Sequence, residues 1–313
     1  MSLIQSEDLD LKVQTSVGVR RHHRFNVGRV AAWVGLWVFV LATLFPFYWM
    51  IRTAFSTTNA LSASPGSMLP VGATVGAVLR VLGLESPKEA LAQGGSGASM
   101  DFLGSLKNSL IVAIIITVVQ TASCALAAFA FARLRWKGRN AVFFVFITAL
   151  MIPPIFTTLP NFVMIRDAGL FNTYLGITLP TMLMAPFAVF FLRQFFLGIS
   201  REVEESAMID GAGYLRRFFG LVVPMSSGPI ITLAMLTFIG AWNDYMWPLL
   251  VAPDAKVRTL TVALGVFRSQ TPQTGPDWAG LMAAALIAAI PIVVLYLALG
   301  KRVINSIGFS GIK

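Results

Sequence analysis

The chain has 313 residues, of which 56% are hydrophobic and only 12% are charged, and its mean hydropathy is +0.75. A soluble protein of this length needs many more polar side chains to cover its surface, so the composition indicates an integral membrane protein. A net charge of +10 suits nucleic acid binding in a soluble protein, but here it first indicates Lys and Arg retained on the cytoplasmic side. We therefore expect membrane lipid as a partner and no nucleic acid. The single cysteine, Cys124, excludes an internal disulfide.

The first 29 residues predict a cytoplasmic tail with a basic end. Four arginines between residues 20 and 29 precede an apolar run from Val30 to Ile51. That run of roughly 22 residues is longer than the core of a signal peptide, and no A-x-A cleavage pattern follows it. The sequence therefore predicts a retained first membrane span, with a tail over residues 1–29 and a transmembrane domain over residues 30–313.

Six apolar runs are long enough to cross the ~30 Å hydrocarbon core as helices, which takes about 20 residues each. Barrel strands alternate over ~10 residues, and these runs lack that pattern, so the predicted fold is all-α with six transmembrane helices. Pro153, Pro154 and Pro160 are expected to kink or break the third helix. The predicted spans are Val30–Ile51, Leu110–Ala132, Ala141–Ile165, Leu175–Phe196, Pro224–Leu250 and Gly280–Leu299.

The distribution of Lys and Arg predicts which side of the membrane each loop occupies. With the N-terminus in the cytoplasm, 16 of the 24 Lys and Arg fall on the cytoplasmic side. The short turn from Arg133 to Arg139 is the strongest anchor, because short loops dominate the positive-inside rule. Both termini are then cytoplasmic, as are the loop 200–223 and the C-terminal tail 300–313. The long first loop, 53–107, lies outside and contains a Gly/Ser linker over residues 93–99.

A polar segment interrupts the apolar sequence between Glu204 and Pro224. Ser200 can cap a helix whose first turns carry three glutamates, where negative charge suits the helix dipole. Gly211 and Gly213 then permit a sharp break. The pattern predicts two short helices at an angle, standing off the membrane for a partner to bind. The alternative is an amphipathic loop that contacts only solvent.

The spacing of this segment resembles the EAA loop of ABC importer permeases, E-A-A-x3-G-x9-I-x-L-P. The chain has Glu205-Ser206-Ala207, then Gly211, and after nine further residues Leu221-Val222-Val223-Pro224, with mild departures at three positions. In that family the loop docks into a groove on a separate ATPase subunit. The resemblance therefore implies a contact through which the ATPase drives this chain. The residues expected at this contact are Glu204, Glu205, Ala207, Asp210, Gly211 and Ala212.

Further motifs between Asn108 and Lys313 resemble the carbohydrate-uptake branch of these permeases, most of all those of maltose importers. The resemblance implies the type I ABC importer permease fold, with six transmembrane helices and a cytoplasmic coupling helix. It also implies a multi-pass protein of the bacterial inner membrane that pairs with a second homologous permease. Further implied partners are an ATPase dimer that carries ATP and Mg, and an extracytoplasmic sugar-binding protein. The motifs are Ala128–Arg133, Ile152–Pro154, Gly169–Tyr174 and Trp242–Leu249.

The end of the fifth predicted span carries candidates for a substrate pathway. Asn243 and Asp244 can hydrogen-bond sugar hydroxyls, while Trp242 and Tyr245 can stack on a sugar face. The same residues also suit an interfacial acid and an aromatic belt at the membrane surface, together with Trp247. Both interpretations stay open. By resemblance, the outer loop 251–279 meets the binding protein.

The chain lacks the motifs of an enzyme. It has no G-x4-G-K-[ST] loop for nucleotide phosphates, and its two histidines, His22 and His23, have no metal-ligand or triad spacing. We therefore expect no catalytic residue, no metal and no cofactor on this chain. An ion-coupled secondary transporter is the alternative function, but it needs further buried ionisable groups. The sequence does not name the sugar.

Overall fold

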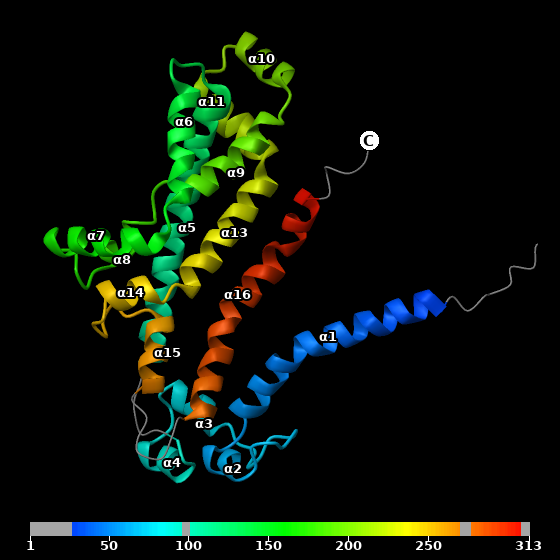
Figure 1. Cartoon of the computed structure of the whole chain (residues 1–313), viewed down its shortest axis with the longest axis vertical. Coiled ribbons are helices and arrows are strands. Elements are labelled where there is room, and N and C mark those ends of the chain that lie inside the picture. The colour runs from blue at the N-terminus through cyan, green and yellow to red at the C-terminus, as the bar shows by residue number, and fades with distance from the viewer. Residues whose placement is uncertain (1–26, 96–100, 270–276, 308–313) are drawn as a thin grey trace, which may run out of the picture. The chain divides into compact units, whose positions relative to one another are not determined.

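The structure is a computed structural model that describes residues 27–95, 101–269 and 277–307. The predicted tail up to residue 26, both histidines, part of the Gly/Ser linker, residues 270–276 and the last six residues lie outside the described residues. The chain forms two compact units, Met1–Tyr48 and Trp49–Lys313, and each is described by itself. The elements of the described residues are all helical (Figure 1).

Helix α1 (Val27–Ala54) begins in the first unit and ends in the second. In the first unit its large apolar side chains are exposed, among them Trp33, Trp37 and Phe39. A helix that is apolar on all sides requires lipid or another protein around it. Its length and composition are those of a membrane span, as the sequence predicts.

Three short helices fold much of the predicted first outer loop: α2 (Thr58–Ala63), α3 (Gly76–Val81) and α4 (Pro87–Ala92). Ser86 and Glu89 form a capping box at the start of α4, and the hydrogen bond from Ser86 lowers the pKa of the Glu89 carboxyl. Arg80 Nη1 pairs with Glu85 at 3.2 Å and Arg80 Nη2 with Asp277 at 3.0 Å, all three side chains being buried. This network fastens the loop to the residue before α16.

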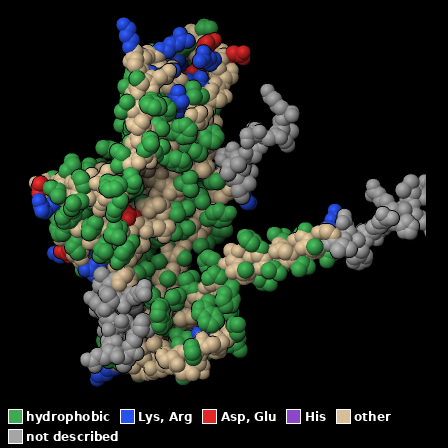
Figure 2. Space-filling view, in the orientation of Figure 1, with side chains coloured by type: hydrophobic (Ala, Val, Ile, Leu, Met, Phe, Trp, Pro, Cys, Tyr) green, Lys and Arg blue, Asp and Glu red, His purple; other side chains and the backbone are tan. Residues whose placement is uncertain are grey.

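The second unit is built around four helices that pack along one another (Figure 1). Small buried residues on α5, among them Ala113, Cys124 and Ala128, let the neighbouring helices approach closely. Figure 2 shows apolar side chains along the length of this bundle and charged side chains gathered at the end that carries α10 and α11. The four helices are α5 (Phe102–Arg133), α9 (Pro186–Leu197), α13 (Ser227–Asn243) and α16 (Trp278–Ile307).

The third predicted span is broken rather than continuous. Helix α6 (Arg139–Thr148) leads through a short 3-10 turn, η1 (Ala149–Met151), to α7 (Pro154–Asp167), and the two parts are bent by 98°. The break falls at Pro153-Pro154, where proline lacks a backbone N–H and its ring clashes with the preceding helical turn. The predicted break is confirmed at Pro153 and Pro154, whereas Pro160 lies inside α7.

The fourth and fifth predicted spans are also interrupted, which the sequence did not predict. The fourth is divided into α8 (Tyr174–Thr178) and α9, and the 12 residues of α9 measure only ~18 Å. The fifth ends at Asn243, before α14 (Met246–Val251). Within the described residues, three helices are long and apolar enough to cross a membrane, or up to five if each bent pair is one span.

Candidate functional site

The polar segment forms the two short helices that the sequence predicts, α10 (Arg201–Ile209) and α11 (Tyr214–Arg217). The Ser200 hydroxyl accepts a hydrogen bond from the Glu202 amide at 3.3 Å and caps α10. Gly211 has φ +78° and ends the helix, because that left-handed conformation suits a residue without a Cβ. Ala212 N then donates to Ala207 O at 2.9 Å. The break at Gly211 sets the direction of the chain after α10.

Five of the six expected coupling residues are at least partly exposed. Glu205, Asp210 and Gly211 are exposed, while Ala207 and Ala212 are half-buried. Ile209 is 87% exposed, so an apolar side chain lies among acidic ones on the same surface. A surface of this kind suits a partner that offers basic groups around an apolar depression.

The sixth expected residue, Glu204, points inward. Its Oε2 pairs with Arg133 Nη1 at 3.3 Å, and both side chains are more than nine-tenths buried. Arg133 Nη2 also donates to the carbonyls of Phe196 and, at 2.6 Å, Ile199. The last residue of α5 therefore holds together the end of α9 and the start of α10. The sequence indicates Arg133 as a topology anchor and as the end of the Ala128–Arg133 motif, but no local pattern indicates this pairing.

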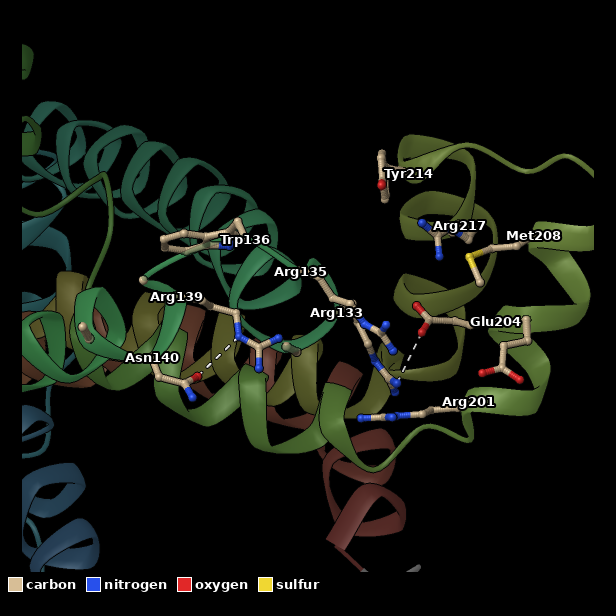
Figure 3. A pocket seen from close by; sticks show the side chains of 14 residues that line it. Arg133, Arg135, Trp136, Arg139, Asn140, Arg201, Glu204, Met208, Tyr214 and Arg217 are labelled. Carbon is tan, nitrogen blue, oxygen red and sulfur yellow. Dashed lines mark hydrogen bonds and ion pairs between the residues drawn. The ribbon is translucent and has the colours of Figure 1, made fainter.

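A cavity of about 670 Å³ lies between the α5–α6 turn and the α10–α11 segment (Figure 3). Arg217, from α11, is buried to 92% and its guanidinium lies 4.8 Å from the ring centre of Tyr214. Arg217 Nε and Glu204 Oε1 have no hydrogen-bond partner among the described residues. Two buried polar groups are thus left open beside this space.

A second connection runs from α11 to the bundle. From α11 the chain continues through a π-helical turn, η2 (Phe218–Val222), and α12 (Val223–Met225) into α13. The segment Tyr214–Met225 and the helix α13 are bent by 81° relative to each other. Phe218 packs against Phe129 of α5, with ring centres 5.3 Å apart. Since π-turns often mark functional positions in helices, this bend is a candidate hinge between α10 and α13.

The structure separates the four substrate-pathway candidates. The Trp242 ring is buried in the core and stacks on Phe238 at 5.8 Å, so it faces neither a membrane surface nor the cavity described above. Asn243 and Tyr245 are exposed and Asp244 is half-buried, at the break between α13 and α14. Gly265 packs so closely on Tyr245 that a Cβ there would lie 2.8 Å from the ring.

Polar side chains of α5 stabilise the break before α9. Gln120 Nε2 donates to the Thr181 carbonyl, and Ser123 Oγ donates to the Leu183 carbonyl at 2.8 Å. Thr237 of α13 donates to Gln120 Oε1 at 3.2 Å. Non-helical backbone at membrane depth requires such partners, and broken helices often line transport sites. The sequence analysis did not single out Gln120, whose polarity inside an apolar run is the signal that could have found it.

Metal chemistry finds no support in the described residues, which contain no group of three or more His, Cys, Asp or Glu side chains able to hold an ion. The cavity beside Arg217 instead carries five arginines against two glutamates. What the arrangement provides is a binding surface on α10 and mechanical connections from it to α5 and α13.

Comparisons with known proteins agree with this arrangement. The family described as "Binding-protein-dependent transport system inner membrane component" matches residues 121–307. The permease protein UgpE of the sn-glycerol-3-phosphate transport system of Agrobacterium fabrum is 34% identical, over 86% of this chain and 92% of that protein. MalG, a trehalose/maltose transport system permease of Thermococcus litoralis, is 28% identical, over 91% of this chain and 97% of its own length.

The fold is shared with a solved structure. A chain of a bacterial ABC transporter involved in the import of the acidic polysaccharide alginate matches with a TM-score of 0.73 and 20% identity, covering 88% of this chain and 96% of that one. Family membership replaces the alternative of an ion-coupled secondary transporter. The chain belongs to the family of binding-protein-dependent transport system inner membrane components, and it is a non-catalytic, multi-pass inner-membrane permease subunit of an ABC importer.

Proposed function

We propose that the substrate imported through this permease is a sugar or an oligosaccharide. The support comes from the trehalose/maltose permease, which the chain matches over 91% of its length, and from the motifs of the carbohydrate-uptake branch. The relative from a glycerol-3-phosphate system favours a small polyol phosphate as a second candidate. Uptake of a labelled sugar by the complete transporter is measured in the presence of unlabelled sugars or of unlabelled glycerol 3-phosphate. Inhibition by sugars alone favours the sugar, and inhibition by glycerol 3-phosphate favours the polyol phosphate.

The same proposal assigns α10 as the coupling helix. Its outward residues, Glu205, Asp210 and Gly211, with Ala207 and Ala212 beside them, contact a separate ATPase subunit that binds ATP and Mg. The complete assembly contains two ATPase subunits, a second homologous permease and an extracytoplasmic sugar-binding protein. The observation that carries this proposal is the geometry of α10, which exposes an acidic and apolar surface while Glu204 ties it to α5.

Movement of α10 passes to the spans along two routes. One is the buried pair between Arg133 and Glu204, which joins α10 to the end of α5. The other is the turn η2, which joins α11 to α13. Closure of the ATPase dimer then rocks α5 and α13 between inward-open and outward-open states. Asn243, Asp244 and Tyr245, at the far end of α13, border the substrate pathway in this proposal, and the Trp242 ring packs behind them.

We assign the six membrane crossings to α1, α5, α6, α9, α13 and α16, with both termini and α10 in the cytoplasm. The positive charges of the α5–α6 turn support this orientation. The shortness of α6 and α9 is offset by the irregular segments beside them, whose backbone is partly satisfied by α5. Helix α7 then lies along the outer membrane surface, and the folded loop 53–107 lies outside.

Gly211→Val tests the coupling contact. A Cβ at Gly211 meets no atom within 4 Å, so the substitution acts through the left-handed backbone, where a β-branched residue costs about 1–3 kcal/mol. We expect the variant to insert in the membrane but to lose the ATPase on co-purification and to lose transport. Gly169→Val is the matched control, because Gly169 has φ +70° and equally open surroundings on the far side of α7. Retention of the ATPase at the wild-type level by Gly211→Val would contradict the assignment.

A further inference from the structure

The cavity between the α5–α6 turn and the α10–α11 segment carries an excess of positive charge. Five arginines line it, and the carboxylates in its wall are those of Glu204 and Glu205, which leaves a formal excess of three positive charges. One glutamate is already paired with Arg133. The arginines are Arg133, Arg135, Arg139, Arg201 and Arg217.

Arg217 is the group that indicates a missing ligand. Its side chain is buried to 92%, it forms no ion pair within the described residues, and its Nε has no hydrogen-bond partner there. Leaving such a buried donor unpaired destabilises the folded chain, and more so for a charged group. Stacking on Tyr214 at 4.8 Å fixes the plane of the guanidinium without satisfying the Nε–H. The site is therefore built but incomplete.

The neighbouring side chains restrict the chemistry of that ligand. Arg139 is held in place by hydrogen bonds from Nη1 to the Leu134 carbonyl at 3.0 Å and from Nε to Asn140 Oδ1 at 3.4 Å, and it lines the cavity from the α6 side, across from Arg217 on α11 (Figure 3). Guanidinium groups bind phosphate oxygens through paired N–H donors. Glu204 Oε1 adds an unpartnered acceptor, which suits a hydroxyl group. A phosphate that carries a hydroxylated substituent fits both features.

We propose that this cavity binds the phosphate-bearing headgroup of an anionic phospholipid such as phosphatidylglycerol. Its volume of about 670 Å³ lies in the range that holds a small molecule. Basic pockets between transmembrane helices on the cytoplasmic side are suited to anionic headgroups. The phosphate accepts hydrogen bonds from Arg217 and Arg139, and a glycerol hydroxyl donates to Glu204.

The surface next to the cavity favours a lipid over a soluble phosphate. Trp136 and Ala141 line the cavity, and Trp136 is 40% exposed, as expected for an aromatic ring at headgroup level. Phe144 and Val145 lie three and four residues after Ala141 on α6, and they are 70% and 67% exposed. The face of α6 that begins at the cavity therefore continues as an apolar track on which acyl chains can lie.

The charges of α10 argue against an acidic protein segment as the occupant. Glu202, Glu205 and Asp210 are all exposed on α10, so a partner that docks there must present positive charge. An acidic segment of that partner would pass these carboxylates before it reached Arg217. A lipid reaches the cavity from the side of α6 and meets only Glu205 of these three, in the cavity wall. A bound headgroup would contact both the α5–α6 turn and α11, and would thereby connect the coupling segment to the membrane surface.

Lipid retention by the complete transporter tests the site. The assembled complex is placed in nanodiscs of phosphatidylcholine with graded amounts of phosphatidylglycerol of the same acyl length, and retained lipids are measured by native mass spectrometry. We expect Arg217→Gln and Arg139→Gln each to lower the retention of phosphatidylglycerol about fivefold, because one arginine contact to an anionic headgroup is lost in each variant. Retention of phosphatidylcholine stays unchanged. Arg166→Gln, which removes an exposed arginine on α7, leaves both unchanged.

Several results would overturn the proposal. Wild-type retention of phosphatidylglycerol by both cavity variants would remove the site, and Arg139→Gln alone decides the matter if Arg217→Gln does not assemble. Equal displacement of the lipid by millimolar inorganic phosphate would show that the cavity binds a soluble anion instead. Retention only after the ATPase is removed would show that an acidic segment of the partner occupies the cavity. A loss of phosphatidylglycerol that is confined to the two cavity variants supports the lipid site. This result does not depend on whether Gly211→Val retains the ATPase.

Discussion

Two clusters of buried arginines and carboxylates, on opposite sides of the second unit, differ in how completely they are paired. In the outer loop, Arg80 uses both terminal nitrogens to hold Glu85 and Asp277, whose side chains are 4% and 1% exposed. At the coupling segment, Arg133 holds Glu204, but Arg217 beside them has no carboxylate partner within the described residues. The first cluster pairs both terminal nitrogens of its arginine with carboxylates and fixes a loop, although the Nε of Arg80 also has no partner among the described residues. The second leaves charge available for something outside the chain, as a site of docking and transmission requires.

This contrast identifies the role of each cluster through the cost of breaking it. Removing one partner of a buried ion pair costs about 3–5 kcal/mol, because the other charge stays buried without compensation. The consequence of this loss of stability depends on which cluster is broken. At the outer cluster it loosens a loop, whereas at the inner cluster it releases α10, the proposed coupling helix.

The largest expected effect is that of Glu204→Gln on transport. The substitution removes the carboxylate charge paired with the buried Arg133 guanidinium and leaves only neutral oxygens around it, so α10 loses its ionic tie to α5. We expect transport to fall more than about tenfold while the ATPase still binds and hydrolyses ATP, which corresponds to a loss of at least about 1.4 kcal/mol of coupling. The ratio of substrate imported to ATP hydrolysed in proteoliposomes measures this directly.

A double variant separates coupling from folding. In Arg133→Met with Glu204→Met both charges are gone, and a buried pair replaced by apolar residues of similar size is often as stable as the original. We expect its thermal stability to return toward the wild-type value while transport stays low. Normal transport with Glu204→Gln alone would show that the pair only stabilises the fold.

A smaller effect on transport is expected when the outer cluster is broken. Arg80→Gln leaves Glu85 and Asp277 buried near each other without a cation, so the loop 53–107 should lose about 3–5 kcal/mol of local stability. Faster amide hydrogen exchange in α3 and α4 measures this loss. The ATPase should stay bound and coupled, since the Arg80 pairs join α3 to the residue before α16 and not to α10. Release of the ATPase by Arg80→Gln would contradict the division of roles between the clusters.

The pairings in both clusters could not be predicted from the sequence, whereas several helices could. The helices α1, α5 and α16 are uninterrupted apolar runs, so length and composition predict them well. The break at Pro153-Pro154 is equally visible, because proline acts locally. The pair between Arg80 and Asp277 joins residues 197 positions apart, and no local pattern brings them together.

The candidate site divides in the same way. The cap at Ser200 and the left-handed turn at Gly211 follow from local chemistry, and a spacing motif points to their role. The inward direction of Glu204 does not, because it depends on Arg133 at the end of another helix. The role of Gln120 cannot be predicted from local sequence for the same reason. It stabilises the broken backbone at Thr181, which lies 61 residues away. Contacts made across the bundle require the fold itself.

The smallest effect on stability and transport is expected from breaking a third pair, Arg166 and Asp167. This pair tests whether the distance between the charges or their burial sets the strength of an ion pair. These neighbours on α7 lie 2.9 Å apart, closer than Arg133 and Glu204, yet their side chains are 59% and 61% exposed. Water screens such a pair, so Arg166→Gln should change the free energy of unfolding by less than about 0.5 kcal/mol and leave transport intact. Thermal unfolding of the purified complex beside Glu204→Gln measures the difference. A loss as large as that of the buried variant would mean that distance, and not desolvation, sets the strength of these pairs, and the contrast between the two buried clusters would then lose its physical basis.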